Sequence, residues 1–528
     1  MYDLAIINGT IIDGTGRDSY IGNIGINGNK IAYLGTDDLD ARKIIDARGL
    51  TVSPGFIDVH GHSDMEFLLE DVKLESRIFQ GITSEIAGNC GISIIPVPED
   101  DHYHDLFKKS SSAYVKVLDN INSKLSNIED YKRIFNETDK TINCGLLVGH
   151  GSLRTAAMGF DNRRPSPEEM SIMKELLDFE LENGALGMSL GLTYSPGSFS
   201  EKEELIELGK VIKDHDAILT AHIRDEKDKV FEAVKEMIDL ADQSGAHVHI
   251  SHLKIMGKDN WGRAEDLVDL IRQANDRGIR ITSDLYPYNA SSTSLSAVLP
   301  YWAQEGGISK MIERINDRSS NIESEIEKLI NGRGGGERIK ISDTLGILPD
   351  YENKFLSDIC GQLGISPSQT VIKILTETKG NAKAIYFSMS DEDVNYILSQ
   401  EDIIVGSDGY GFDYDKPNGS PHPRSFGSFP RFLRMSSELE GMSKESIIKR
   451  MTAMPADYFN LKDIGRIEEG MFADITIFNW DDFTDTSTFE QPYQKPLGLN
   501  HVIVSGQVLV KDGRLTQKRP GRWIEKKV

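Results

Sequence analysis

Apolar and polar residues follow one repeating pattern through most of the chain. Between residues 55 and 461, short apolar runs alternate with longer stretches of helical periodicity. Short apolar runs predict buried strands, and the longer stretches predict amphipathic helices. Strands alternating with helices over this length predict an α/β fold, a (β/α)8 barrel of the TIM type. The eight predicted strands are 55–59, 84–86, 143–148, 185–189, 218–222, 247–251, 280–285 and 403–407.

The two ends of the chain have a different, strand-rich pattern. Near the N-terminus two β-branched runs flank Asn8-Gly9, which is a turn signal, and residues 501–513 repeat this arrangement around Ser505-Gly506. Neither piece is long enough for its own core, so we expect them to pair into one small β-sandwich domain. The predicted boundaries are 1–54 with 462–528 for this β-domain and 55–461 for the catalytic barrel.

Residues 288–345 interrupt the barrel pattern after the seventh strand. They begin with Ser291-Ser-Thr-Ser, continue with acidic helical stretches and end in a glycine-rich run. We therefore expect an insertion in the barrel, placed where it can act as a lid over the mouth.

Composition and charge favour a globular protein and argue against several other classes. Hydrophobic residues make up 39% and charged residues 27%, which is typical of a globular chain. The formal net charge of −24 argues against nucleic acid as a partner. There is no secretory signal and no apolar run of about 18 residues, so no membrane span is expected. Three cysteines are too few for a disulfide framework, and a cytoplasmic protein is predicted.

Side chains that can bind a metal follow several of the predicted strands. In a barrel, the C-terminal ends of the strands meet at the face that carries the active site. Each of these side chains alone is equally consistent with a structural role, but their shared placement favours a metal site. The residues concerned are His60, His62, Cys90, His222, His252 and Asp408.

Their order, with the entry Pro54-Gly-Phe-Ile-Asp-Val-His60 and the later stretch 465–478, resembles the metal-dependent amidohydrolase superfamily. Many members carry a carboxylated lysine after the fourth strand, but residues 185–192 contain no lysine. Gly88-Asn-Cys90-Gly91 instead resembles the N-acyl-D-amino-acid deacylases, or D-aminoacylases. Further matching stretches are 191–197, 221–226, 251–254, 284–288, 407–409 and 422–433.

The resemblance implies a zinc site whose tight position uses Cys90, His222 and His252. A thiolate with imidazoles is a typical zinc donor set. A second, weaker site would use His60, His62 and Asp408, with Cys90 able to bridge. Whether that second site is filled stays open.

The resemblance also implies roles in catalysis and substrate binding. Zinc would activate a water molecule, with Asp408 as general base and acid. Tyr194 would hydrogen-bond the acyl carbonyl and stabilise its oxyanion. Arg424 would bind the substrate carboxylate, assisted by Lys254 and Tyr286.

The implied reaction is hydrolysis of an N-acyl-D-amino acid, a small anionic substrate, to a carboxylate and a free D-amino acid. The D preference rests on the resemblance alone. Alternatives are a D-aminoacyl dipeptidase, a cyclic-amide hydrolase of the same superfamily, or an inactive binding protein on this scaffold. Ser291 and Ser292 could contact the substrate or form a hinge. The sequence leaves the oligomeric state open.

Overall fold

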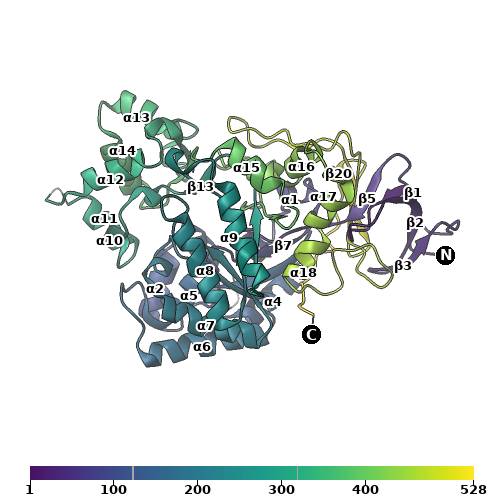
Figure 1. Ribbon diagram of the computed structural model, residues 1–528, viewed down its shortest axis with the longest axis horizontal. Coiled ribbons are helices and arrows are strands. Elements are labelled where there is room, and N and C mark those ends of the chain that lie inside the picture. Colours follow the sequence, from purple (N-terminus) through teal and green to yellow (C-terminus); the bar gives the residue numbers. More distant parts are fainter. Residues whose placement is uncertain (122–123, 318, 528) are drawn as a thin grey trace.

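The computed structural model describes residues 1–121, 124–317 and 319–527, and three parts are visible in it (Figure 1). At the centre, eight parallel strands form one sheet in the order β16-β12-β11-β10-β9-β8-β7-β6. The prediction of eight barrel strands is confirmed. They are β6 (Phe56–Asp58), β7 (Ile82–Ala87), β8 (Asn143–Gly149), β9 (Gly187–Gly191), β10 (Ile218–His222), β11 (His247–Ile250), β12 (Ile281–Leu285) and β16 (Ile404–Val405).

The first and last strands nearly close the barrel. A parallel bridge joins Gly61 to Gly409, and the backbone N–H of Asp408 donates to the His60 carbonyl at 2.8 Å. Because β6 ends next to the residues that follow β16, His60 and Asp408 are brought together from opposite ends of the barrel sequence.

Helices cover the outside of the barrel, and their apolar faces join the strands in the largest hydrophobic core. Among the described residues, no helix is both long and apolar enough to cross a membrane. The barrel helices are α1 (Glu75–Ile78), α2 (Asp101–Lys109), α3 (Ser112–Asn120), α4 (Ile128–Glu137), α5 (His150–Met158), α6 (Pro167–Glu182), α7 (Lys202–Asp214), α8 (Val230–Ser244), α9 (Ala264–Asp276), α15 (Asp391–Leu398), α16 (Arg424–Ser437), α17 (Lys444–Met451) and α18 (Ala453–Tyr458).

The two chain ends form one mixed sheet of nine strands, in which β17 pairs with β5 and so joins the C-terminal strands to the N-terminal ones. Isoleucines from both ends share its core, as the short length of each piece predicts. The last residues leave the sheet, and Trp523 and Ile524 pack on the barrel. The strands are β1 (Leu4–Ile11), β2 (Tyr20–Asn27), β3 (Lys30–Gly35), β4 (Ile44–Asp46), β5 (Thr51–Pro54), β17 (Ile475–Phe478), β18 (Leu499–Val504), β19 (Gln507–Lys511) and β20 (Arg514–Leu515).

The expected turn at Asn8-Gly9 is wrong. β1 runs through this point as one strand, and its pairing with β2 shifts register between Ile6 and Gly9. Asn8 takes a φ of 61°, so the Asn-Gly pair makes a β-bulge rather than a hairpin. The matching signal Ser505-Gly506 does form the turn between β18 and β19, with positive φ at both residues.

The insertion after β12 is a compact unit with its own core. It contains the three-stranded sheet β13-β15-β14, and its core runs from Leu295 to Tyr386, well past the predicted end at residue 345. In Figure 1 it lies at the end of the molecule opposite the terminal sheet. Its elements are β13 (Ser291–Ser294), α10 (Tyr301–Gln304), α11 (Ile308–Ile315), α12 (Ile322–Asn331), β14 (Ile339–Asp343), α13 (Leu356–Leu363), α14 (Pro367–Glu377) and β15 (Lys383–Tyr386).

One buried carboxyl of the barrel shell predicts how stability depends on pH. Burial, aided by nearby Glu129 and Asp130, raises the pKa of Glu180 to about 8 from 4.5. The folded protein therefore binds this proton more tightly than the unfolded chain, and stability falls as pH rises from about 4.5 to 8. We expect Glu180→Gln to raise the free energy of unfolding by up to about 5 kcal/mol at pH 9 and by less than about 1 kcal/mol at pH 5.

Urea unfolding of the wild type and the variant at both pH values checks this expectation. The exposed neighbour Glu182 supplies the matched control, Glu182→Gln. A stabilisation that is equal at pH 5 and pH 9 would contradict the account.

Candidate metal centre

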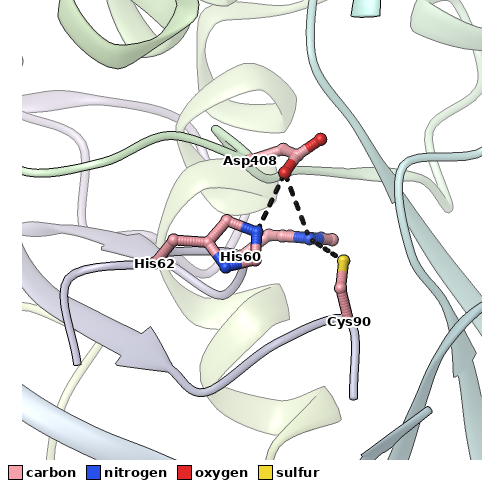
Figure 2. A group of neighbouring side chains, drawn as sticks. All are labelled: His60, His62, Cys90 and Asp408. Carbon is pink, nitrogen blue, oxygen red and sulfur yellow. Dashed lines mark hydrogen bonds and ion pairs between the residues drawn. The ribbon is translucent and has the colours of Figure 1, made fainter. Parts of the chain in front are cut away.

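The six predicted side chains converge at the C-terminal ends of the barrel strands. Figure 2 shows His60 and His62 from one segment, with Cys90 and Asp408 from two others, and the four side chains point toward one another. Each offers a ligand atom within 4.8 Å of the others. A second group, Cys90 with His222 and His252, meets the same criterion. Cys90 belongs to both groups, so one thiolate can serve two neighbouring metal positions.

Short contacts define the two groups. In the first, Nε2 of His60 lies 3.4 Å from Sγ of Cys90, and Nε2 of His62 lies 3.0 Å from Oδ1 of Asp408. In the second, Sγ of Cys90 lies 3.7 Å from Nε2 of His252, which lies 2.9 Å from Nδ1 of His222. Donors this close, with no intervening side chain, are arranged as they would be around a cation.

Three of these residues have a left-handed backbone. Cys90, His252 and Asp408 have φ values of 57°, 40° and 49°. Such a conformation is costly for a residue with a side chain and is concentrated at functional sites. At Cys90 the next residue must also be Gly91, because a Cβ there would lie 2.5 Å from the backbone nitrogen of Gly191. The chain thus turns sharply at the strand ends and aims these side chains inward.

The chemistry of the donors fits zinc. Burial alone would raise the pKa of Cys90, but the charge of His60 and hydrogen bonds from His222 and His252 hold it well below its ordinary value. The thiolate, a soft ligand, is therefore the favoured form, and imidazole nitrogens complete a set typical of zinc.

Glu226 orients two of the histidines and was missed by the sequence reasoning. Its Oε1 lies 3.2 Å from Nδ1 of His252, and its Oε2 lies 3.7 Å from Nε2 of His222. Nδ1 of His252 also lies 2.7 Å from Nζ of Lys254, so both members of the Lys254–Glu226 pair contact this outer nitrogen. Partners on the outer nitrogen fix the orientation of the ring and leave the inner nitrogen free to bind a metal. The only sequence signal was its place at the end of the matching stretch 221–226.

Asp284, at the end of β12, does the same for His60. Its Oδ2 lies 3.2 Å from Nδ1 of His60 and 3.0 Å from Nε2 of His249, and its Oδ1 accepts the backbone N–H of His252. His249 thus contacts Asp284 and not the candidate ligand groups. His247 hydrogen-bonds Thr282 at 2.8 Å.

Asp408 and Arg424 form an ion pair beside the metal-binding groups. Nη1 of Arg424 lies 2.7 Å from Oδ2 of Asp408, and its Nη2 donates to the carbonyl of Ser292 at 3.0 Å. Burial would raise the pKa of Asp408, but Arg424 and the hydrogen bond from His62 hold it well below its usual range. Asp408 is therefore ionised, and its second oxygen is occupied by a guanidinium.

The two tyrosines and Lys254 also line this region. The hydroxyl of Tyr194 hydrogen-bonds Oγ1 of Thr293 at 3.0 Å. The buried hydroxyl of Tyr286 has no hydrogen-bond partner among the described residues, and its ring lies against Arg424. Lys254 differs from expectation in one respect: its Nζ is already bound to Oε1 of Glu226 at 2.5 Å, so it is not a free cation.

We expect Glu226→Gln to weaken zinc binding by about 10–100-fold, because removal of a carboxylate behind metal-binding histidines typically has that effect. Competition with a chelator, followed by elemental analysis, measures the change. The exposed Glu232 on α8 supplies the matched control, Glu232→Gln, which should bind zinc as the wild type does. Equal zinc affinity in the two variants would refute the role given to Glu226.

A match to a protein-family model shows which family the chain belongs to. The model of the amidohydrolase family matches residues 43–306 and 398–510. The chain belongs to the amidohydrolase family. The gap between the two matched segments, residues 307–397, contains most of the insertion, so the match covers the barrel and only the first part of the insertion.

Individual proteins of known activity show which members of the family the chain is similar to. The chain is 34% identical to an N-acyl-D-glutamate deacylase and 31% identical to a D-aminoacylase of Alcaligenes xylosoxydans xylosoxydans, covering 99% of this chain and 96% and 97% of theirs. A crystal structure of N-acyl-D-glutamate deacylase from Bordetella bronchiseptica, complexed with zinc and a phosphonate mimic of the tetrahedral intermediate, matches with a TM-score of 0.82 at 31% identity over 99% of both chains. This amidohydrolase is therefore deacylase-like over its whole length.

Proposed function

We propose that the protein is a zinc-dependent hydrolase of the amide bond in N-acyl-D-amino acids, releasing a carboxylate and a free D-amino acid. One observation carries the proposal: a buried cluster of cysteine, histidine and aspartate lies directly beside a buried arginine and a tyrosine hydroxyl that has no hydrogen-bond partner in the described part of the chain. The cluster of candidate metal ligands suits hydrolysis of an amide. The arginine and the tyrosine suit binding of a substrate carboxylate. The D configuration comes from the relatives named above.

The metal would be held by Cys90, His222 and His252, with His60, His62 and Asp408 available for a second ion. Zinc, when bound, supplies a Lewis acid that polarises a carbonyl and acidifies water. Glu226 and Asp284 contact the outer nitrogens of His252 and His60. These contacts fix the imidazole rings so that their inner nitrogens are free to bind the metal.

The protein's own groups would divide the remaining work. The ionised carboxylate of Asp408 accepts a proton from the attacking water and returns it to the leaving amine. The hydroxyl of Tyr194 donates to the carbonyl oxygen, whose negative charge increases during attack. Arg424 and the free hydroxyl of Tyr286 bind the substrate carboxylate, because a guanidinium and a phenol together present convergent donors. Lys254 keeps Glu226 ionised and in position.

A hydrolysis screen of paired N-acetyl-D- and N-acetyl-L-amino acids tests the proposal, with zinc measured on the same preparation. We expect turnover of D substrates only, in proportion to zinc content. A cyclic imide and a D-dipeptide belong in the same panel, since they test the alternative amidohydrolase reactions. Turnover of the cyclic imide alone would overturn the proposal, because that substrate has no carboxylate for Arg424.

A further inference from the structure

The insertion directs one face of its small sheet away from its own core. On β15, Ala384 and Tyr386 belong to the insertion's hydrophobic core, together with Ala382 just before the strand. Since side chains alternate along a strand, Lys383 and Ile385 project from the opposite face. The neighbouring strand β13 contacts the candidate site, where the carbonyl of Ser292 and the hydroxyl of Thr293 bind Arg424 and Tyr194. The β13 edge of the sheet therefore borders the barrel mouth.

Lys383 extends from this face toward the metal-binding groups. Its Nζ lies 4.0 Å from the centre of the Tyr410 ring, in the loop that follows Asp408. The Tyr410 ring is in turn stacked on His62, with centroids 5.4 Å apart. One aromatic ring thus separates the ammonium of an insertion residue from a residue of the candidate metal centre.

Lys383 differs from Arg424 and Lys254 in having no carboxylate in ion-pair contact among the described residues, although Asp343 is its cross-strand neighbour on β14. Arg424 is paired with Asp408 and Lys254 with Glu226. Within the described part of the chain, no carboxylate oxygen lies within 4.0 Å of Nζ of Lys383. Burial would lower the pKa of Lys383, but Tyr410, Asp343 and the more distant Glu66 outweigh it, so the amine stays charged.

We propose that Lys383 is a specificity-determining residue that favours substrates with a second negative charge in addition to the α-carboxylate. A half-buried ammonium with no carboxylate in direct contact gains an ion pair when a substrate carboxylate arrives, whereas a neutral group provides none. The second charge can sit on the amino-acid side chain or at the far end of the acyl group. This inference rests on the proposed function for the identity of the substrate.

Two isosteric substrate pairs test the proposal and separate the two sources of charge. N-acetyl-D-glutamate is compared with N-acetyl-D-glutamine, and N-succinyl-D-leucine with N-succinamoyl-D-leucine. In at least one pair the wild type should show a kcat/KM for the acid about tenfold above that for the amide. Lys383→Met should remove this preference and Lys383→Arg should keep it. The pair that responds identifies where the second charge binds.

The matched control is Lys310→Met, which removes a solvent-exposed lysine from the same insertion. It should leave both ratios unchanged. Zinc content is measured on every variant. Loss of zinc, caused by a disturbed contact between Tyr410 and His62, would lower kcat/KM equally for all four substrates. Unchanged ratios in Lys383→Met, or an equal loss for all four substrates, would overturn the proposal.

A binding measurement keeps the result independent of the proposed function. Calorimetry on the zinc-loaded Asp408→Asn variant compares the acid and amide of each pair without turnover. If the wild type hydrolyses none of the four compounds, the proposed function fails. The acid-to-amide Kd ratio, with and without Lys383, then still supports or refutes an anion preference at this residue.

Discussion

Replacing Cys90 with alanine is expected to abolish tight zinc binding and to lower kcat/KM by at least about 10³-fold. Its thiolate is the one donor shared by both groups of candidate ligands. Without it, neither group keeps a soft ligand, and two imidazoles alone hold zinc far less tightly. Elemental analysis after dialysis and a hydrolysis assay with added zinc measure the two effects.

The chain offers a matched control for this experiment. Cys360, in α13 of the insertion, is a free and half-buried cysteine far from the candidate metal centre in sequence. Cys360→Ala should keep wild-type zinc content and activity. Thermal unfolding of both variants shows whether the fold survives. Unchanged zinc in a folded Cys90→Ala protein would remove Cys90 from the ligand set.

Much of the barrel and of the metal centre could be predicted because both depend on short-range patterns. Each barrel strand is a compact apolar run, and parallel connections bring all its C-terminal ends to one face. Residues directly after those runs, such as His60, Cys90 and Asp408, therefore had to lie together. Their left-handed backbone was not predictable, because it depends on close packing such as that between Gly91 and Gly191.

The residues that support the site were harder to predict because their partners are distant in sequence. Glu226 and Asp284 resemble many other acidic residues until folding places His252 and His60 against them. For the same reason, the ion pair between Lys254 and Glu226 was not predictable, although Lys254 itself was expected near the substrate. A carboxylate that orients a ligand has no local pattern of its own.

The extent of the insertion illustrates the same limit on a larger scale. β13 and β15 pair along their length, yet a long helical segment separates them in the chain. The sequence pattern shows where the barrel rhythm stops, near residue 288. It does not show that β15 returns to the start of the unit, since strand pairing over such separation follows from the shared core rather than from local composition.

Asp408→Asn is expected to lower kcat by about 10²–10⁴-fold while the tight zinc ion is retained. The amide side chain has the same shape, but it cannot take a proton from water or return one to the leaving amine. The group that we propose holds the tight ion, Cys90 with His222 and His252, does not include Asp408, so zinc content should stay near that of the wild type. Steady-state kinetics and elemental analysis on one preparation test both parts.

The ratio of effects on kcat and KM separates proton transfer from a purely structural role of Asp408. Because Asp408 also holds Arg424, its loss would in a purely structural role misplace the guanidinium that we propose binds the substrate carboxylate. That fault would raise KM and leave kcat nearly unchanged, as uniform loss of binding does. A large fall in kcat at constant zinc content requires a group that acts in the transition state. The exposed Asp415 in the same loop provides the control Asp415→Asn, which should alter neither constant. Near-normal kcat in zinc-loaded Asp408→Asn would therefore assign the proton transfer to another residue.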